Sequence, residues 1–278
     1  MNHAFSKKEL GNILVTAISD GYLDANFNLL ANIDVTECEI IQRNAHQKKL
    51  NAVHINTFLV QQQGINILID AGAGGIKGWG GELVNNLTRL SLKPKDIDAI
   101  LLTHAHPDHI GGLLTSNGEV VFPNAKLLIS QEEYHYLEDE KSFLSASDRI
   151  KNNIIFARNV FKQYQDSLCF INKNEVFPNI FAIPMQGHTP GHTGYKIIGS
   201  KQSLLIWGDI VHFPYIQLLK PNVSIAFDYD PNLAIETRTQ VLNMVCRDNI
   251  LVGGMHFGPK GFGYIKKSQT GYKIVTDD

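Results

Sequence analysis

The segment LLTHAHPDHIGG, residues Leu101–Gly112, gathers three histidines and one aspartate within six positions. Imidazole nitrogens and carboxylate oxygens bind divalent transition-metal ions, and a cation organises groups that would gain little by crowding together alone. A lone histidine is more often an ordinary hydrogen-bonded residue. Four candidate ligands in one short segment instead predict a metal site, and they are His104, His106, Asp108 and His109.

The backbone around this segment predicts how the four side chains are directed. The apolar residues before Thr103 indicate a strand, and Pro107 prevents regular sheet pairing and favours extended backbone just before it. We therefore expect all four side chains to project from a loop at the strand's end. Alternate residues of extended backbone share a face, so the first two histidines should point the same way. The aspartate and the third histidine then leave in another direction. Two diverging sets of ligands suit two adjacent metal ions.

A further candidate ligand follows an apolar run in three later segments. FAIPMQGH ends in His188, LLIWGD ends in Asp209, and ILVGGMH ends in His256. Each of these residues comes just after a predicted strand. If the strand ends lie along one rim, the three groups converge on the first cluster.

Short apolar runs bounded by Gly, Asn, Asp or Pro recur along the chain, as strands usually do. The strands expected from them are Asn12–Ile18, Val53–Val60, Ile65–Ile69, Ala99–Leu102, Lys126–Ile129, Ile180–Pro184, Tyr195–Ile198, Ser203–Trp207 and Ile250–Val252.

Helix signals lie between these strands. Leucines in 83–90 have the spacing of one helix face. Ser130 with Glu133 has the spacing of a capping box for a helix over 131–140, and Asp230 before Pro231 has the pattern of an N-cap and first turn. Interleaved strands and helices indicate a layered α/β protein.

The 278 residues and 44% hydrophobic content suffice for a substantial core, and no linker or repeat divides the chain. We expect one domain over residues 1–278. Residues 141–164 are either a helical insertion flanking the site or an ordinary surface helix. The formal charge of −2 gives no electrostatic support for a nucleic-acid surface, so no nucleic-acid partner is expected.

The three cysteines, at 38, 169 and 246, are odd in number and far apart, which argues against a disulfide framework. No signal peptide is evident at the start, and no run approaches the ~20 apolar residues of a membrane span. We therefore expect a cytoplasmic protein with no membrane partner, although a chain from which a leader had been trimmed would read the same.

The order H-x-H-x-D-H, then a distant His, Asp and His, resembles the signature of the metallo-β-lactamase-fold hydrolase superfamily. The resemblance implies an αβ/βα four-layer sandwich, with two mixed β-sheets face to face and helices outside. It also implies two divalent metal ions, one held by His104, His106 and His188, the other by Asp108, His109 and His256, with Asp209 bridging both. Zinc is the default ion, and iron, manganese or cobalt suit related sites.

Within this superfamily, the segments GHTPGHTGY and LLIWGDIVHFPYIQ, with FDYDP, resemble the branch of N-acyl-homoserine lactonases and methyl parathion hydrolase. The bridging position is Asp209 rather than the cysteine or serine of true β-lactamases, which disfavours penicillin hydrolysis. The leading expectation is a lactonase that opens N-acyl-homoserine lactones or similar lactones. The alternatives are an organophosphate or aryl-ester hydrolase, a metallonuclease, or a non-enzymatic metal site; a homodimer is a family-based expectation.

The resemblance also assigns roles. A hydroxide bridging the two ions would attack the substrate, and Asp108 or Asp209 would carry its proton to the leaving oxygen; the family analogy favours Asp108 for this role and Asp209 as the bridging ligand. His212, where several lactonases have tyrosine, would donate a hydrogen bond or serve only as an outer support. Asp70 would either orient a ligand imidazole or cap a turn. His192 is expected to support the loop.

Two further groups of residues have only general expectations attached to them. Aromatic residues near the ligand segments would either line an apolar pocket for the substrate or fill the core, and they are Trp79, Phe213, Tyr215, Phe257 and Phe262. Four histidines without neighbouring ligands are expected to be ordinary: His3, His46, His54 and His135.

Overall fold

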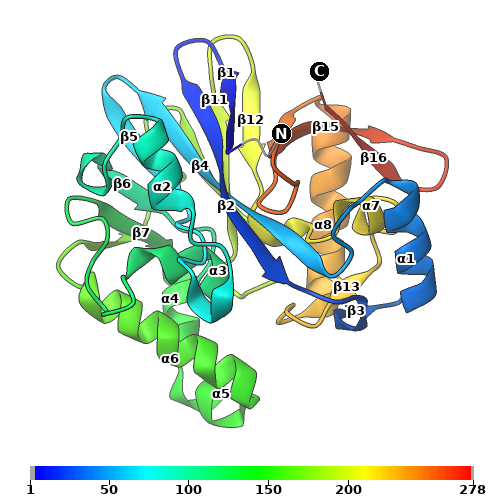
Figure 1. The fold of residues 1–278 in the computed structure, drawn as a ribbon, viewed down its shortest axis with the longest axis horizontal. Helices are drawn as coiled ribbons and strands as arrows, with labels where there is room; N and C mark the ends of the chain where they lie inside the picture. Colours follow the sequence, from blue (N-terminus) through cyan, green and yellow to red (C-terminus); the bar gives the residue numbers. More distant parts are fainter. Residues whose placement is uncertain (1–3, 277–278) are drawn as a thin grey trace.

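The computed structural model describes residues 4–276, so His3 lies outside the described residues. Within that range two seven-stranded mixed sheets lie face to face (Figure 1). In order across the first sheet, the strands are β1 (Phe5–Glu9), β2 (Leu14–Asp24), β4 (Ala52–Gln62), β5 (Ile65–Ile69), β6 (Ala99–Leu101), β7 (Lys126–Ser130) and β8 (Leu168–Ile171).

The second sheet is built from the C-terminal half of the chain. Its strands, in order, are β16 (Tyr272–Val275), β15 (Phe262–Lys267), β14 (Leu251–Gly253), β12 (Ser203–Ile206), β11 (Thr193–Ile198), β10 (Ile180–Pro184) and β9 (Glu175–Phe177). A small two-stranded ribbon joins β3 (Leu30–Ala31) to β13 (Ser224–Ile225).

Strand β5 shows why the apolar runs of the sequence are almost unbroken. Ile67 and Ile69 face the core between the two sheets, whereas Leu68 faces the helices on the opposite side. Because side chains alternate along a strand, a strand buried on both faces has no polar position left. β5, β6, β7 and β8 pair in parallel in this way, which places the ends of β5 and β6 at the same edge of the sheet.

Helices cover the outer face of each sheet. On the first sheet they are α2 (Leu83–Arg89), α4 (Gln131–Glu138) and α6 (Asp148–Gln163), and on the second sheet the main one is α8 (Pro231–Arg247). The remaining helices of the described range are α1 (Val35–Asn44), α3 (Pro107–Ile110), α5 (Glu140–Ser145) and α7 (Pro214–Gln217), and the same range contains five short 3-10 turns. This arrangement confirms the αβ/βα four-layer sandwich (Figure 1).

Residues 141–164 contain most of α5 and the whole of α6. Ile154, Ala157 and Phe161 of α6 are buried in the cluster that also contains the outer face of the first sheet. This apolar stripe therefore attaches α6 to the core, while the start of α6 reaches the pocket described below.

None of the helices within residues 4–276 is long and apolar enough to cross a membrane. The three cysteines are unpaired, as their spacing predicts. The capping prediction at Asp230 is confirmed, because its side chain accepts hydrogen bonds from the backbone N–H groups of Asn232 and Leu233 at the start of α8.

Candidate metal centre

The structure brings all seven sequence-predicted ligands to one edge of the sandwich. Five of them follow the end of a strand, namely β6, β10, β12 or β14, and Asp108 and His109 lie within the short helix α3 that comes after β6. Their ligand atoms form overlapping groups in which every atom lies within 4.8 Å of the others; the groups are His104, His106 and His188, then Asp108, His109, Asp209 and His256, and a third with His188, Asp209 and His212.

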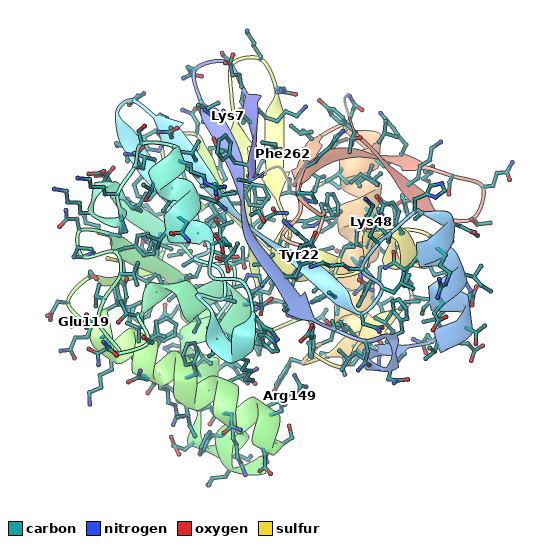
Figure 2. All side chains as sticks on the ribbon, in the orientation of Figure 1. Lys7, Tyr22, Lys48, Glu119, Arg149 and Phe262 are labelled. Carbon is teal, nitrogen blue, oxygen red and sulfur yellow. The ribbon has the colours of Figure 1, made fainter. Side chains whose placement is uncertain are left out.

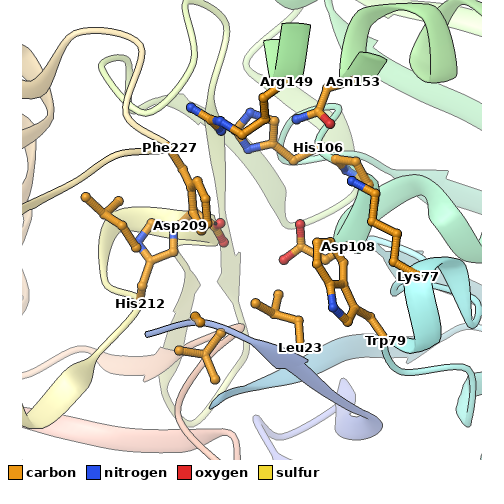
Figure 3. Close-up of a pocket in the computed structure, with 14 residues that line it drawn as sticks. Leu23, Lys77, Trp79, His106, Asp108, Arg149, Asn153, Asp209, His212 and Phe227 are labelled. Carbon is orange, nitrogen blue, oxygen red and sulfur yellow. Dashed lines mark ion pairs between the residues drawn. The ribbon is translucent and has the colours of Figure 1, made fainter. Parts of the chain in front are cut away.

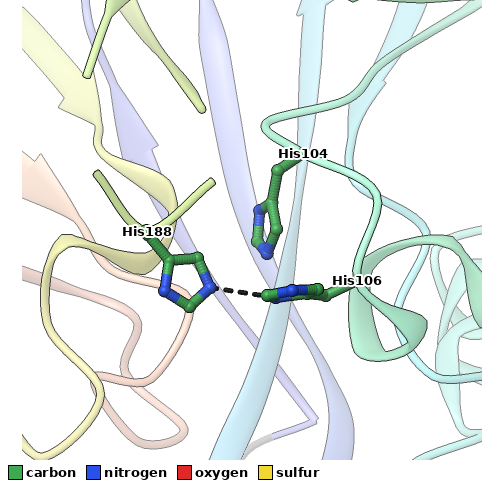
Figure 4. A group of neighbouring side chains, drawn as sticks. All are labelled: His104, His106 and His188. Carbon is green, nitrogen blue, oxygen red and sulfur yellow. Dashed lines mark hydrogen bonds between the residues drawn. The ribbon is translucent and has the colours of Figure 1, made fainter. Parts of the chain in front are cut away.

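The first group is a cluster of three imidazoles (Figure 4). His106 Nδ1 lies 3.0 Å from His188 Nε2, and the ring centroids of His104 and His106 are 4.6 Å apart. The expected common direction of His104 and His106 therefore holds. The prediction was wrong in one detail: Asp108 does not lie in a loop but in α3, because Pro107 occupies its first turn, where a missing N–H costs nothing.

Asp209 stands between the two groups. Its Oδ1 lies 3.2 Å from His109 Nε2 and 3.3 Å from His256 Nε2. Its Oδ2 lies 3.4 Å from His188 Nε2 and 3.8 Å from His104 Nε2. One carboxylate oxygen thus faces each group, which is the geometry a bridging ligand needs.

Asp70 resolves one alternative that the sequence left open. Its Oδ2 lies 2.7 Å from His109 Nδ1, and its oxygens accept hydrogen bonds of 2.8 Å from the backbone N–H and the hydroxyl of Thr103. The carboxylate therefore fixes the ring of His109 with Nε2 turned toward the cluster. It also ties the end of β5 to the segment that carries His104.

Two more histidines are oriented by acceptors that are remote in sequence. His188 Nδ1 lies 2.8 Å from Asp228 Oδ1, and His256 Nδ1 donates to the carbonyl oxygen of His54 at 2.6 Å. A metal-binding histidine usually donates its other N–H to such an acceptor, which sets the tautomer. His54 was expected to be ordinary, but it supports the site because its backbone carbonyl holds one candidate ligand.

The cluster passes a direct test of fit for metal ions. Among the described side chains, five buried atoms that face the centre have no hydrogen-bond partner: His104 Nε2, His109 Nε2, His212 Nε2, His256 Nε2 and Asp209 Oδ1. Burying polar atoms without partners costs free energy, and a divalent cation would satisfy nitrogen and oxygen donors together. The donor set suits borderline ions such as zinc.

The shifted pKa values of the cluster also favour metal binding. Burial, followed by the nearby His109, lowers the pKa of His104 well below its ordinary value, so this ring is in the neutral form that binds metals. Burial alone would raise the pKa of Asp108, but His109 outweighs it and the pKa falls to about 2. Burial opposes charge on His109, yet Asp209 and Asp108 raise its pKa well above its ordinary value. The carboxylates thus stabilise positive charge beside them.

Gly208 and His192 fix the backbone of the bridging aspartate. The 3-10 turn Gly208–Ile210 follows β12, and the N–H of Asp209 donates to His192 Nε2 at 2.9 Å, while His192 Nδ1 donates to the carbonyl of Met185 at 2.8 Å. Gly208 has φ +58°, and a Cβ there would meet His192 Nε2 at 2.3 Å. His192 is accordingly a support for the loop, in agreement with its expected role.

Glu133 is a buried residue whose capping signal in the sequence explains only part of its contacts. Ser130 Oγ accepts a hydrogen bond from the N–H of Glu133, as an N-cap does, but the carboxylate does not complete a capping box. It accepts from the backbone N–H groups of Ala105 and Gly191, both at 3.0 Å, and from the hydroxyl of Thr189 at 2.6 Å. One carboxylate therefore joins the loop of His104 and His106 to the loop of His188.

A pocket of about 560 Å³, including its open mouth, leads to the cluster (Figure 3). Asp108, Asp209, His106 and His212 line its inner end. His212 is buried, and its Nε2 lies 3.1 Å from Asp209 Oδ2. The other lining residues are Leu23, Ala25, Val53, Lys77, Trp79, Pro107, Arg149, Asn153, Ile225 and Phe227.

The structure separates the aromatic residues that the sequence grouped together. Of the five, Trp79 lines this pocket. Phe213 and Phe262, the latter labelled in Figure 2, are buried in core clusters. Phe257 packs against the core beside Trp207, and Tyr215 borders a separate groove next to α1. Most of the set therefore fills the interior, because nearness in sequence to a ligand does not direct a side chain toward it.

The comparisons with known proteins agree with this geometry. Residues 50–249 match the family model described as the metallo-beta-lactamase superfamily. The chain belongs to this superfamily. The match covers most of the chain and includes six of the seven predicted ligands, while His256 follows just beyond it.

Curated relatives of this superfamily member are distant. An uncharacterized protein, YobT, from Bacillus subtilis is 31% identical over 56% of this chain, and an exodeoxyribonuclease, WalJ, from Streptococcus pneumoniae is 35% identical over 30% of it. The chain spans 61% and 30% of the lengths of these two relatives. An N-acyl homoserine lactonase from a Bacillus species is 29% identical over 70% of this chain and 66% of its own.

Two solved structures resemble the whole chain. One is a hydrolase named AbOPH in the beta-lactamase superfamily, with 28% identity and a TM-score of 0.91 over 100% of this chain and 99% of its own. The other is AidC, a dizinc quorum-quenching lactonase solved with the product of an acyl-homoserine lactone, with 26% identity, a TM-score of 0.91 and the same coverage. They confirm the fold along its full length.

Proposed function

We propose that this protein is a metal-dependent hydrolase that opens N-acyl-homoserine lactones or similar small lactones. The observation that carries the proposal is the convergence of seven histidine and aspartate ligands at the inner end of a largely apolar pocket. The similarity to AidC and to the Bacillus lactonase supports lactones as the substrate class.

The site would hold two zinc ions. His104, His106 and His188 would hold one, Asp108, His109 and His256 the other, and Asp209 would bridge them. Two divalent ions bound there would supply a hydroxide nucleophile at neutral pH and stabilise the charge that develops as the ester bond breaks.

The residues of the chain would then divide the remaining work. Asp108 has 13% of its side chain exposed and faces the pocket, so it is the carboxylate placed to carry a proton to the leaving oxygen. Asp209 is buried and surrounded by five imidazoles, so it would keep its position rather than move a proton. His212 also lines the pocket, and burial lowers its pKa, so its neutral ring would donate a hydrogen bond to the substrate.

The pocket walls suit the acyl portion of such a substrate. Leu23, Val53 and Ile225 provide aliphatic surface, and Trp79 and Phe227 provide aromatic surface. Apolar walls with a few polar groups at one end bury an acyl chain and leave the reactive carbonyl at the ligand cluster.

A lactone panel tests this proposal directly. The zinc-loaded protein is mixed with lactones of increasing chain length, and the acid released by ring opening is titrated. Asp108→Asn should lower turnover by at least a hundredfold while changing the midpoint of thermal unfolding little. The absence of turnover on every lactone would remove the assignment, and an equal collapse of turnover and folding would favour a purely structural metal site.

An organophosphate or aryl-ester hydrolase is the second candidate. It is favoured by His212 at the position where several lactonases have tyrosine, and by Trp79 and Phe227, which would stack on an aryl leaving group. The kcat/KM values for a lactone and for a nitrophenyl phosphotriester decide between the two. A higher value for the phosphotriester would replace the first candidate by the second.

A further inference from the structure

The outer part of the pocket carries two cationic side chains and one amide. Arg149 and Asn153, four residues apart on α6, present the same helix face to the pocket. Lys77 reaches the pocket from a different part of the chain, the 3-10 turn Ile76–Gly78 (Figure 3). All three are at least partly accessible to solvent.

Arg149 is fixed in place without a carboxylate partner. One of its Nη groups donates to the carbonyl oxygen of Ala226 at 2.6 Å, and its guanidinium lies 5.2 Å from the ring centroid of Phe227. Among residues 4–276 it forms no ion pair. The planar guanidinium therefore keeps free N–H groups in the fork geometry that matches a carboxylate.

Lys77 is likewise positioned but has no acidic partner. Its Nζ lies over the ring of Trp79, 5.1 Å from the centroid, and its backbone has the left-handed φ of +55°. No ion pair to it is found in the described part of the chain. The contact with the Trp79 ring therefore places the ammonium group at the pocket wall.

Charges in this pocket are segregated. The acidic residues that line it are Asp108 and Asp209, and both lie at the ligand cluster, where metal ions would balance them. The outer cations have no such balance, and the walls between the two ends are apolar. An uncompensated cation beside a low-dielectric wall attracts an anion more strongly than it would in open water.

We propose that the substrate of this site carries a carboxylate at the end remote from its reactive carbonyl, bound by Arg149 and Lys77 with Asn153 beside them. The class is a carboxylate-terminated lactone or ester with an apolar spacer. The inference deepens the proposed hydrolase function and rests on it for the nature of the reacting group, whereas the charge preference belongs to the pocket walls alone.

The test measures binding, so that it does not depend on turnover. Calorimetry on the zinc-loaded protein compares two amides of equal length, the monoanilide of glutaric acid and the neutral anilide of pentanoic acid. The anionic amide should bind about tenfold more tightly, and this ratio should fall about fivefold in Arg149→Met and in Lys77→Met, the effect of one partly exposed charged contact. Raising the salt to about 0.5 M should reduce the ratio in the same direction.

Lys151→Met is the matched control, because it removes the same charge from α6 at a position that does not line the pocket. It should leave the ratio unchanged. Equal binding of the two amides would overturn the inference. So would a preference for the anion that survives both Arg149→Met and Lys77→Met, since the carboxylate would then bind elsewhere, for instance at the metal ions.

Failure of the proposed function has a different signature. In that case no lactone in the panel is opened, while the ratio of the two amide affinities still follows Arg149 and Lys77. The two conclusions therefore stand or fall on separate measurements.

Discussion

Replacing Glu133 by Gln tests whether one buried carboxylate sets the spacing of the first ligand group. One oxygen of Glu133 accepts from the N–H of Ala105, and the other accepts from Gly191 and Thr189. Glutamine has nearly the same volume but a single acceptor oxygen. Its amide nitrogen would have to face the N–H of either Ala105 or Gly191, so one of the two loops would lose its attachment.

The size of the effect follows from these contacts. Glu133 is 1% exposed, so water does not replace the lost acceptor. Leaving one buried N–H without a partner costs about 1–3 kcal/mol, and we expect the free energy of unfolding of the metal-free protein to fall by about 2 kcal/mol. Loss of an outer support typically weakens metal affinity about 10–100-fold, and we expect the lower part of this range because the histidines themselves remain.

Two measurements separate the effect on folding from the effect on the site. Urea unfolding of the metal-free protein gives the stability, and titration with Co²⁺, followed by its visible spectrum, gives affinity and ligand geometry. Glu132→Gln, an exposed change on the same helix, should alter neither. A drop in stability with unchanged cobalt affinity and spectrum would refute the reasoning, because Glu133 would then brace the fold without setting the distance between the loops.

Three further predictions follow from the site and the core. Removing metal with a chelator should abolish hydrolysis and lower the melting temperature, since free zinc at a hundredfold excess over its Kd stabilises by about 2.7 kcal/mol; an unchanged melting temperature would argue against a bound ion. Gly208→Ala should lower the free energy of unfolding in urea by at least about 2 kcal/mol, because the backbone has φ +58° and the new Cβ would meet His192 Nε2 at 2.3 Å. Gly118→Ala is the control: its φ is +80° but the space around it is open, so it should lower the free energy of unfolding by only about 1 kcal/mol. Burial raises the pKa of Tyr164 to about 12, so the folded state favours the neutral phenol. The contribution of this residue to the free energy of unfolding is therefore complete below about pH 10 and is lost as the pH rises toward 12. Tyr164→Phe should flatten that decline in denaturation curves measured from about pH 8 to about pH 12.

The local elements were largely predictable from the sequence. β5 and β10 have the predicted bounds, and α2, α4 and α8 begin where leucine spacing or capping residues indicated. Five strands of the two sheets were not predicted, namely β1, β8, β9, β15 and β16. Four of them, all except β15, lie at a sheet edge, and β1, β9 and β16 have polar residues at positions that interior strands make apolar. Their pairing depends on neighbours contributed by distant parts of the chain.

The supporting residues of the site were mostly beyond sequence reasoning. Asp228 lies in a segment that drew attention only for its family likeness, yet it orients His188 from 40 positions away. Glu133 carried a capping signal that concealed its tertiary role. The contribution of His54 comes from its backbone carbonyl, which no side-chain pattern reveals.

The sequence by itself determined the candidate ligands and their order after successive strands. It could do so because few side chains bind divalent ions and each ligand segment carries its own local strand and turn signals. Only the tertiary structure decided which atom of each imidazole faces the centre, which carboxylate joins the two loops, and which side chains wall the pocket. These choices are made by hydrogen bonds and packing between segments tens to hundreds of residues apart, whose proximity exists only once the two sheets have closed on each other.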